Sequence, residues 1–386
     1  MEIDLQASLH YGNDGSGLSH MNKLTHRERF LKTVRFDNPD RVPLWEFGYL
    51  DTTIERWKSE GLPQAAGLKD FFGLDSVRYF PKDSFFNILG PLPPFNEEIL
   101  EETEEYKIYI DGEGITKKDF KDKTEKSMPL FLKYPIESRK DWEIFKKRLD
   151  PYAPGRYPQA WEAMKNAWKE SDFSLTLFAG SFFGLLRNWI GVENFSVMFY
   201  DDPALVEEMI DYMTDFFIAS TKQALDEVQF DHAHFWEDMA YKNGPLISPE
   251  MVEKFMVPGY KKVMKHLRSY GIDVFSVDCD GNIDELIPIW LEVGINGMLP
   301  CEVAAGMNVV DVRKKYGQDL WIAGGIDKRA LSKGKKEIDD EVLGKLPFML
   351  EKGGYIPTVD HEVPHDIPLA NYMYYLEQVK KCVMKG

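Results

Sequence analysis

Eight short apolar segments alternate with amphipathic stretches along most of the chain, and this alternation constrains the fold more than any other feature. The apolar segments are rich in β-branched and aromatic residues, and the stretches between them have helical spacing. Strands that alternate with helices predict a parallel sheet, because parallel strands need a long crossover connection. The expected strands lie at about 41–46, 76–80, 174–178, 230–238, 274–278, 295–302, 320–327 and 354–361.

Eight such units favour an α/β fold of the (β/α)8 TIM barrel type over an open doubly wound sheet. No GxGxxG pattern follows the first expected strand, as it would in a dinucleotide-binding sheet. Two extended runs flank the turn Asp111-Gly-Glu-Gly114, which predicts a β-hairpin insertion after the second strand. We therefore expect residues 22–386 to form a single barrel domain with an insertion at about 83–150.

Residues 1–21 differ in composition from the rest of the chain. They are rich in Gly, Ser and Asn, and we interpret them as a disordered extension or as a cloning remnant ahead of Met21. The fold begins soon afterwards, because Thr25 and Glu28 have the spacing of a capping box at the start of a helix.

Charge and cysteine content narrow the class of protein. The chain has 64 acidic and 47 basic residues, a balance that argues against binding to nucleic acid or to an anionic membrane. Its three cysteines are far apart and form no CxxC pair, so we expect neither a disulfide framework nor a zinc ribbon. With no long apolar run and no secretory signal, the sequence predicts a cytoplasmic protein.

Ionisable and aromatic residues collect where the expected strands end. In a barrel the carboxyl ends of all strands meet at one face, and activity is found there. The candidate catalytic residues are Asp278, Glu237, His361 and Glu46. The candidate substrate-binding residues are Trp45, Phe47, Tyr49, Tyr79, Phe182 and Trp236.

Each candidate also has an ordinary structural interpretation. Asp280 can cap the helix that follows it, His361 can belong to a solvated polar loop, and aromatic residues at strand ends are often core. Glu237 and Asp238 follow Trp236 on a strand, so one of them is expected to turn inward. Cys279 should face the core, whereas Cys301 is either a small buried residue or a ligand.

Several short segments, in the same order along the chain, resemble the uroporphyrinogen decarboxylase superfamily. They are Arg41-Val-Pro-Leu-Trp45, Gly180-Ser-Phe-Phe-Gly184, Asp278-Cys-Asp-Gly-Asn282, Gly324-Gly-Ile-Asp327 and Gly353-Gly-Tyr-Ile-Pro357 with Asp360-His361. The resemblance covers about residues 22–384 and implies a (β/α)8 barrel. The superfamily contains haem-pathway decarboxylases and corrinoid-dependent methyltransferases, and its members often form homodimers.

The chain departs from the decarboxylases at the place where they hold substrate carboxylates. Those enzymes carry Met-Arg-Gln-Ala-Gly-Arg after the first strand, whereas this chain reads Trp45-Glu46-Phe-Gly-Tyr49-Leu-Asp51. An acidic residue in place of two cations would repel a tetrapyrrole with eight carboxylates. We therefore expect no decarboxylation of uroporphyrinogen.

The methyltransferase branch binds zinc through a His-x-Cys pair and a later Cys. Here Asp278-x-Asp280 occupies the first place and His361 lies near the second. Carboxylates and one imidazole can hold zinc, with Glu237 or Glu302 as a further ligand. The resemblance thus implies a zinc site formed by Asp278, Asp280, His361 and Glu302.

From these features we expect a methyltransferase that moves a methyl group from a small donor, such as a methoxylated aromatic compound, to a corrinoid on a partner protein. The first alternative is a decarboxylase or lyase that acts on a smaller carboxylic acid, for which Arg78, Arg187 and Lys328 are the available cations. The second is a barrel that binds a ligand without chemistry. Proteins with and without Asp278 would then differ only in stability.

Overall fold

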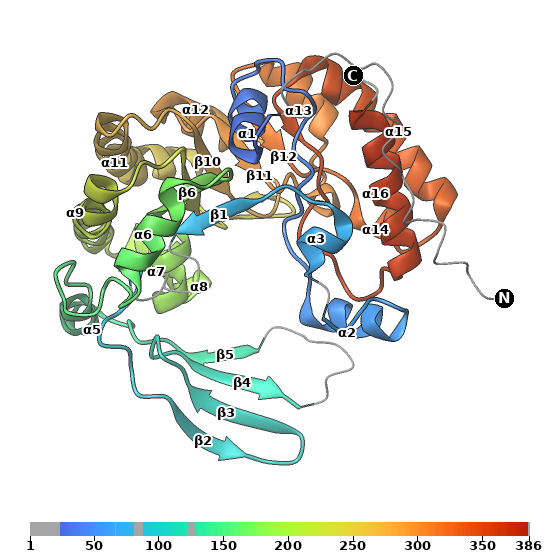
Figure 1. Ribbon diagram of the computed structural model, residues 1–386. Coiled ribbons are helices and arrows are strands. Elements are labelled where there is room, and N and C mark those ends of the chain that lie inside the picture. Colours follow the sequence, from blue (N-terminus) through green and yellow to red (C-terminus); the bar gives the residue numbers. More distant parts are fainter. Residues whose placement is uncertain (1–23, 66, 81–87, 122–128, 385–386) are drawn as a thin grey trace.

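A barrel of parallel strands surrounded by helices forms the body of the molecule in a computed structural model (Figure 1). The structure describes residues 24–65, 67–80, 88–121 and 129–384, so the expected extension at 1–21 lies outside it. The seven strands with regular pairing follow one another in sequence order. They are β1 (Val77–Phe80), β6 (Ser174–Gly180), β7 (His232–Trp236), β10 (Phe275–Asp278), β11 (Gly297–Leu299), β12 (Trp321–Ala323) and β13 (Tyr355–Ile356).

The segment predicted as the first strand, 41–46, completes the barrel without forming a regular ladder. The backbone N–H of Asp75 donates to the Leu44 carbonyl at 2.7 Å, and the Phe47 N–H donates to the Thr358 hydroxyl at 3.3 Å. A regular ladder is prevented because Pro43 has no N–H and the Leu44 N–H donates to the Asp75 carboxylate. The (β/α)8 prediction is confirmed, with the first strand reduced to an extended segment.

Helices surround the barrel and account for most of the remaining chain. The helix α1 begins at Thr25, whose side chain forms the predicted capping box with Glu28. The helices are α1 (His26–Val34), α2 (Asp51–Ser59), α3 (Leu68–Phe72), α5 (Arg139–Phe145), α6 (Trp161–Lys169), α7 (Gly184–Ile190), α8 (Val192–Asp201), α9 (Pro203–Glu227), α10 (Pro249–Met251), α11 (Val257–Ser269), α12 (Ile287–Val293), α13 (Val309–Tyr316), α14 (Lys328–Leu331), α15 (Lys335–Lys352) and α16 (Leu369–Val383). Among the described residues, no helix combines the length and apolar character needed to cross a membrane.

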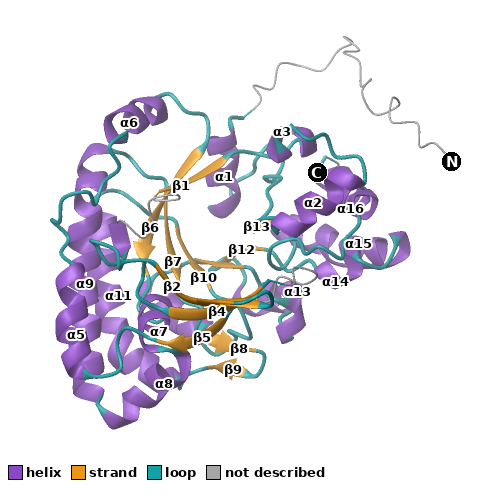
Figure 2. Cartoon of the chain, turned by 90° about the horizontal axis from the view of Figure 1, so that it is seen from below, coloured by secondary structure: helices purple, strands orange, loops and turns teal. Residues whose placement is uncertain are grey.

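The insertion is larger than the predicted hairpin. The hairpin itself is present as β3 (Tyr106–Ile110) and β4 (Thr116–Phe120), and Asp111 accepts from the backbone of Glu113 and Ile115 at 3.0 Å in its turn. Two more strands, β2 (Glu98–Glu102) and β5 (Leu130–Lys133), extend it to a four-stranded antiparallel sheet. Figure 1 shows α1 on one side of the barrel strands and this sheet on the other, and Figure 2 shows the sheet in front of them.

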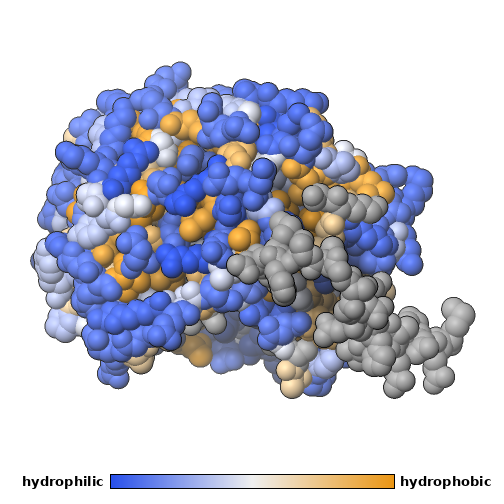
Figure 3. All heavy atoms as spheres, turned by 45° about the horizontal axis from the view of Figure 1, so that its top comes forward, coloured by the Kyte–Doolittle hydropathy of each residue, from blue (hydrophilic) through white to orange (hydrophobic). Residues whose placement is uncertain are grey.

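Side chains of the barrel strands alternate between the interior and the surrounding helices. Phe30 and Val34 of α1 enter the interior and pack with Val274, Leu299, Trp321, Ala323 and Ile356. The alternate residues, such as Phe235 and Val277, belong to the larger core beneath the helices. The face viewed in Figure 3 is mostly hydrophilic, with hydrophobic atoms in small separate areas.

A short two-stranded ribbon follows β7. It consists of β8 (Ala240–Tyr241) and β9 (Gly244–Pro245), and the carbonyl of Tyr241 accepts from the N–H of Asn282 at 3.0 Å. This contact joins the loop after β7 to the loop after β10, where the acidic residues of the next section lie.

Candidate active site

Three carboxylates meet where β7 and β10 end. Asp278 is the last residue of β10 and pairs in register with Trp236, the last residue of β7. Asp238 and Asp280 follow two residues after these positions, and one oxygen of each of the three lies within 4.8 Å of the others. We call Asp238, Asp278 and Asp280 the acidic cluster.

The backbone at Asp238 turns its side chain toward the cluster. Its φ is 40°, a left-handed conformation that Asp tolerates better than most residues. The N–H of Asp280 then donates to Oδ1 of Asp238 at 3.1 Å, which holds the two loops together. Asp238, rather than the predicted Glu237, is therefore the residue after β7 that reaches the mouth of the barrel.

Burial and mutual repulsion disfavour full ionisation of the cluster. Burial raises the pKa of Asp278 well above its usual range, and the nearby charges of Asp238 and Asp280 raise it further. Burial also raises the pKa of Asp238, with a second contribution from Asp280. Such a group either retains a proton near neutral pH or releases it when a cation arrives.

Two cationic groups and one further carboxylate border the acidic cluster. Nη2 of Arg187 lies 2.8 Å from Oδ2 of Asp238, and Nε2 of His361 lies 3.4 Å from Oδ2 of Asp280. The hydrogen bond to Asp280 raises the pKa of His361. Oε2 of Glu302 accepts from the N–H of Gly281 at 2.9 Å, so Glu302 supports the loop that carries Asp280.

The donor atoms of the cluster fit a divalent cation. Oδ1 of Asp280 is buried and has no hydrogen-bond partner among the described residues, which is unusual for a carboxylate oxygen. It lies in a set of three carboxylates with one imidazole beside them. Carboxylate oxygen and histidine nitrogen are both ligands of zinc, so the residues present can hold that ion.

Two predicted catalytic residues lie behind the strands and do not reach the cluster. Glu237 is fully buried and accepts from the Phe183 N–H at 2.7 Å and the Tyr260 hydroxyl at 2.6 Å, and burial raises its pKa to about 6. Glu46 accepts from Thr358, from the Val359 N–H at 3.1 Å and from the Tyr372 hydroxyl at 3.1 Å. Burial raises the pKa of Glu46 to about 7. Both residues follow an inward-facing tryptophan, so strand alternation turns them outward.

Some of the predicted aromatic residues lie at the barrel interior or its mouth, and others pack elsewhere. Trp45 and Phe47 face the interior, and the Phe47 ring lies 5.3 Å from the His361 ring. Trp236 lies beneath Arg187, whose guanidinium carbon is 5.4 Å from the ring centre. Tyr49 and Phe182 pack elsewhere, Tyr49 against Trp57, Phe72 and Tyr372, and Phe182 against Phe217 and Tyr260.

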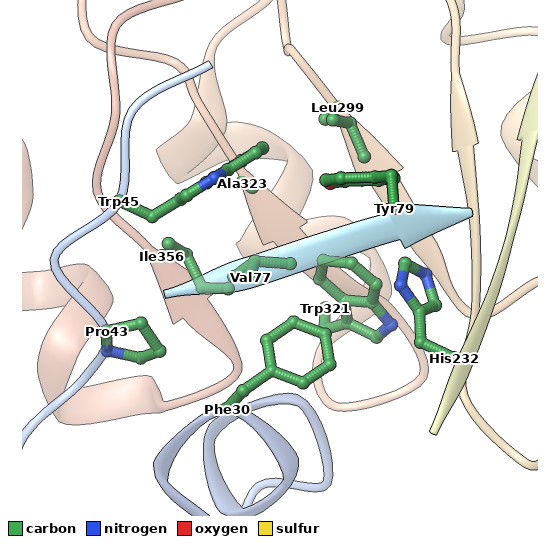
Figure 4. A pocket seen from close by; sticks show the side chains of 10 residues that line it. All are labelled: Phe30, Pro43, Trp45, Val77, Tyr79, His232, Leu299, Trp321, Ala323 and Ile356. Atoms are coloured by element: carbon green, nitrogen blue, oxygen red, sulfur yellow. The ribbon is translucent and has the colours of Figure 1, made fainter. Parts of the chain in front are cut away.

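Tyr79 lies on the inner wall beside the cluster. Burial raises its pKa, and the charge of Asp278 adds to this effect. Figure 4 shows Tyr79 in an aromatic space deeper in the barrel, with Phe30, Trp321, His232 and Trp45. The interior is thus acidic at its mouth and aromatic below it.

The cysteines take no part in the acidic cluster. Cys279 is buried behind the strand as expected, and its sulfur accepts from the Met239 N–H at 3.3 Å. Cys301 is also buried, and burial raises the pKa of its thiol to about 12. Of the two interpretations of Cys301, its surroundings favour the small buried residue.

Comparisons with known proteins agree with this architecture. Residues 119–382 match the family described as "Uroporphyrinogen decarboxylase (URO-D)". A methyltransferase from Methanosarcina mazei has a similar solved structure, with a TM-score of 0.60 and 15% sequence identity, over 93% of this chain and 99% of that one. A search among curated proteins gives no significant match.

Proposed function

The chain belongs to the uroporphyrinogen decarboxylase family, and on this basis we propose that it transfers a methyl group from a small donor to a corrinoid carried by a partner protein. The donor that fits the site best is a methoxylated aromatic compound. The observation that carries the proposal is the acidic cluster, in which one Asp280 oxygen has no partner among the described residues, above an aromatic interior.

The charges at the mouth favour a donor without several carboxylates. Asp238, Asp278 and Asp280 would repel a polycarboxylate substrate, and the neighbouring Arg187 is already paired with Asp238. The side chain of Arg78 lies outside the described part of the chain. A neutral aromatic ether meets no such repulsion, and Trp45, Phe47, Tyr79 and Trp236 offer rings to pack against it.

Demethylation of an ether requires a group that stabilises the departing oxygen, which is a poor leaving group. Asp238, Asp278 and Asp280, with His361 beside them, would hold a zinc ion. When bound, zinc would act as a Lewis acid toward that oxygen. The raised pKa of Asp278 gives the chain a second way to stabilise the departing oxygen, because a protonated carboxyl group can donate a hydrogen bond to it.

Direct observation of methyl transfer tests the proposal. The protein is incubated with a corrinoid protein reduced to Co(I) and with separate methoxylated aromatic and methylated amine donors. The expected result is the absorption spectrum of methyl-Co(III) with at least one ether, and its loss when Asp278→Asn replaces the wild type. Absence of methyl-Co(III) with every donor would refute the proposal.

A decarboxylase or lyase acting on a smaller acid is the second candidate. Nε of Arg187 is buried and has no hydrogen-bond partner among the described residues, so this guanidinium has a free donor near the mouth. Lys328 is a second cation, with Nζ 3.7 Å from Asp360. Release of CO2 from a monocarboxylic acid, abolished by Arg187→Gln, would support this candidate over methyl transfer.

A further inference from the structure

A chain of four buried polar side chains runs through the barrel interior below the acidic cluster. Oγ1 of Thr176 lies 3.0 Å from Nδ1 of His232, whose Nε2 lies 2.7 Å from Oγ of Ser276. The same Ser276 oxygen lies 2.7 Å from Nδ1 of His234. The four side chains come from β6, β7 and β10, and none of the residues is more than 4% exposed.

Both histidines in this chain are neutral. Burial lowers the pKa of His234 to about 3 and that of His232 well below its usual range. A neutral imidazole carries one N–H and one nitrogen with a free lone pair. The hydrogen bonds of the chain therefore decide which nitrogen of each ring holds the proton.

The fully buried hydroxyl of Thr176 selects one direction for the chain. Thr176 Oγ1 has no other hydrogen-bond partner among the described residues, so its hydrogen is satisfied only if it donates to Nδ1 of His232. His232 then carries its proton on Nε2 and donates to Ser276, and Ser276 donates to Nδ1 of His234. The proton of His234 is left on Nε2. The opposite direction would leave the Thr176 hydrogen buried without an acceptor.

His234, at one end of the chain, keeps 4% of its surface accessible, whereas Thr176, at the other end, keeps none. Nε2 of His234 has no hydrogen-bond partner among the described residues, and its direction diverges from that of Nδ1, which contacts Ser276. The ring lies 5.7 Å from that of Tyr79 and 5.3 Å from that of Phe178. Ser276 is two residues before Asp278 on the inward side of β10, so His234 lies one layer below the acidic cluster.

We propose that His234 is a catalytic residue whose neutral Nε2–H donates a hydrogen bond to the substrate oxygen from which the methyl group departs. This inference rests on the proposed function and narrows the donor to a neutral methyl ether. A quaternary ammonium nitrogen has no lone pair to accept such a bond. A fixed neutral donor stabilises developing negative charge on oxygen without needing to release its proton.

The step balances without any group beyond those already named. The bond between the methyl carbon and the ether oxygen breaks, and its electron pair stays on the oxygen. The corrinoid, as the acceptor substrate, supplies the pair for the new bond to the methyl group and passes from Co(I) to Co(III). The oxygen, held by the His234 N–H, takes its proton from Asp278 or from water.

The tautomer of His234 is measurable without any methyl donor. In protein with 15N-labelled histidine, two-dimensional NMR should show that the proton of His234 is on Nε2. The resonances of His234 are assigned as those that are missing from the spectrum of His234→Gln. Thr176→Ser should keep this tautomer, whereas Thr176→Val should give a mixture because the fixed donor at the end of the chain is lost. A wild-type His234 with its proton on Nδ1 would overturn the proposal.

Two substitutions separate the donor at Nε2 from the contact at Nδ1. The amide nitrogen of Gln lies near the position of histidine Nε2, and that of Asn near Nδ1. We expect His234→Gln to retain methyl transfer from methyl phenyl ether within about tenfold, and His234→Asn to lose about 10²- to 10³-fold in kcat. Circular dichroism of both variants checks that they fold, and equal activity of the two would contradict the proposal.

Binding of phenol distinguishes failure of this inference from failure of the proposed function. Phenol is the product expected from methyl phenyl ether, and its oxygen should shift the Nε2–H proton resonance of His234. A shift without methyl transfer to any corrinoid would refute the proposed function and keep His234 as an oxygen-binding residue. No shift at saturating phenol would overturn the role of His234.

Discussion

Nε2 of His361 lies 3.4 Å from Oδ2 of Asp280, although the two residues follow different strands, β13 and β10. The pairing joins the two parts of the chain that correspond in position to the zinc ligands of the methyltransferases. It also places an imidazole beside the acidic cluster without burying it, since the His361 side chain is 37% exposed.

Zinc should stabilise the protein through the acidic cluster. A ligand that binds only the folded state raises the free energy of unfolding by about 2.7 kcal/mol at a concentration of 100 Kd. We expect zinc to raise the midpoint of thermal unfolding of the wild type after chelator treatment, and to have little effect on Asp278→Asn. Asp284→Asn, which changes an exposed carboxylate paired with Lys315, is the matched control and should respond as the wild type does. An equal response of all three proteins would place zinc elsewhere.

Asp278→Asn should separate activity from stability. The substitution removes a buried carboxylate whose ionisation burial and two neighbouring carboxylates oppose, so the metal-free variant should unfold at a urea concentration no lower than the wild type does. Methyl transfer should fall by at least about 10²-fold, because the variant lacks the carboxyl group that either binds the cation or donates the proton. Unchanged activity would show that Asp278 takes no part in the reaction.

Glu46 should make stability fall as the pH rises. Burial raises its pKa from the ordinary 4.5 to about 7, so the folded state binds a proton that the unfolded state releases between these values. Its contribution is complete below pH 4.5 and is lost as the pH passes about 7, a difference on the order of 3 kcal/mol. Urea unfolding at pH 5 and pH 8 should show a smaller loss in Glu46→Gln than in the wild type. If the stability of the wild type and of Glu46→Gln changed equally between pH 5 and pH 8, Glu46 would not titrate in this range.

Two glycine substitutions should have opposite effects. A Cβ at Gly297 on β11 would overlap the indole of the buried Trp321, so Gly297→Ala should lower the free energy of unfolding by about 1–3 kcal/mol or more. Gly344 lies inside α15, where no atom of the described residues comes close to an added Cβ. Gly344→Ala should therefore raise the free energy of unfolding by about 0.5–1 kcal/mol. Urea unfolding of both variants measures the difference, and a stable Gly297→Ala protein would mean that the Trp321 side chain can move.

The alternation of strands and helices was visible in the sequence because each barrel strand is short, apolar and bounded by turn residues. The strand at 41–46 shares this pattern but forms no regular ladder, since Pro43 lacks an N–H and Asp75 occupies the N–H of Leu44. The amphipathic stretch at 184–199 does not form a single helix. It is divided into α7 and α8 at Gly191, where φ is 92° and a Cβ would overlap Tyr134.

The candidate site was predictable only as a collection of strand ends. Asp278 and His361 follow directly from that rule, but the choice between Glu237 and Asp238 depends on a left-handed backbone at Asp238, which local sequence does not determine. The histidines of β7 were missed because a buried His on an apolar strand resembles an ordinary core residue. Their role depends on Thr176 and Ser276 of neighbouring strands, a relationship that appears only in three dimensions.

The carboxylate of Asp75, at the closed end of the barrel, contacts both Arg29 and Arg41 and also the Leu44 N–H. Leu44 is followed directly by Trp45, and Phe47 lies two residues further along the same extended segment. The carboxylate of Asp75, at the end of the barrel opposite the acidic cluster, therefore helps to position these two rings along the barrel axis. Ion pairs at one end of the barrel thus help to set the shape of the mouth at the other end.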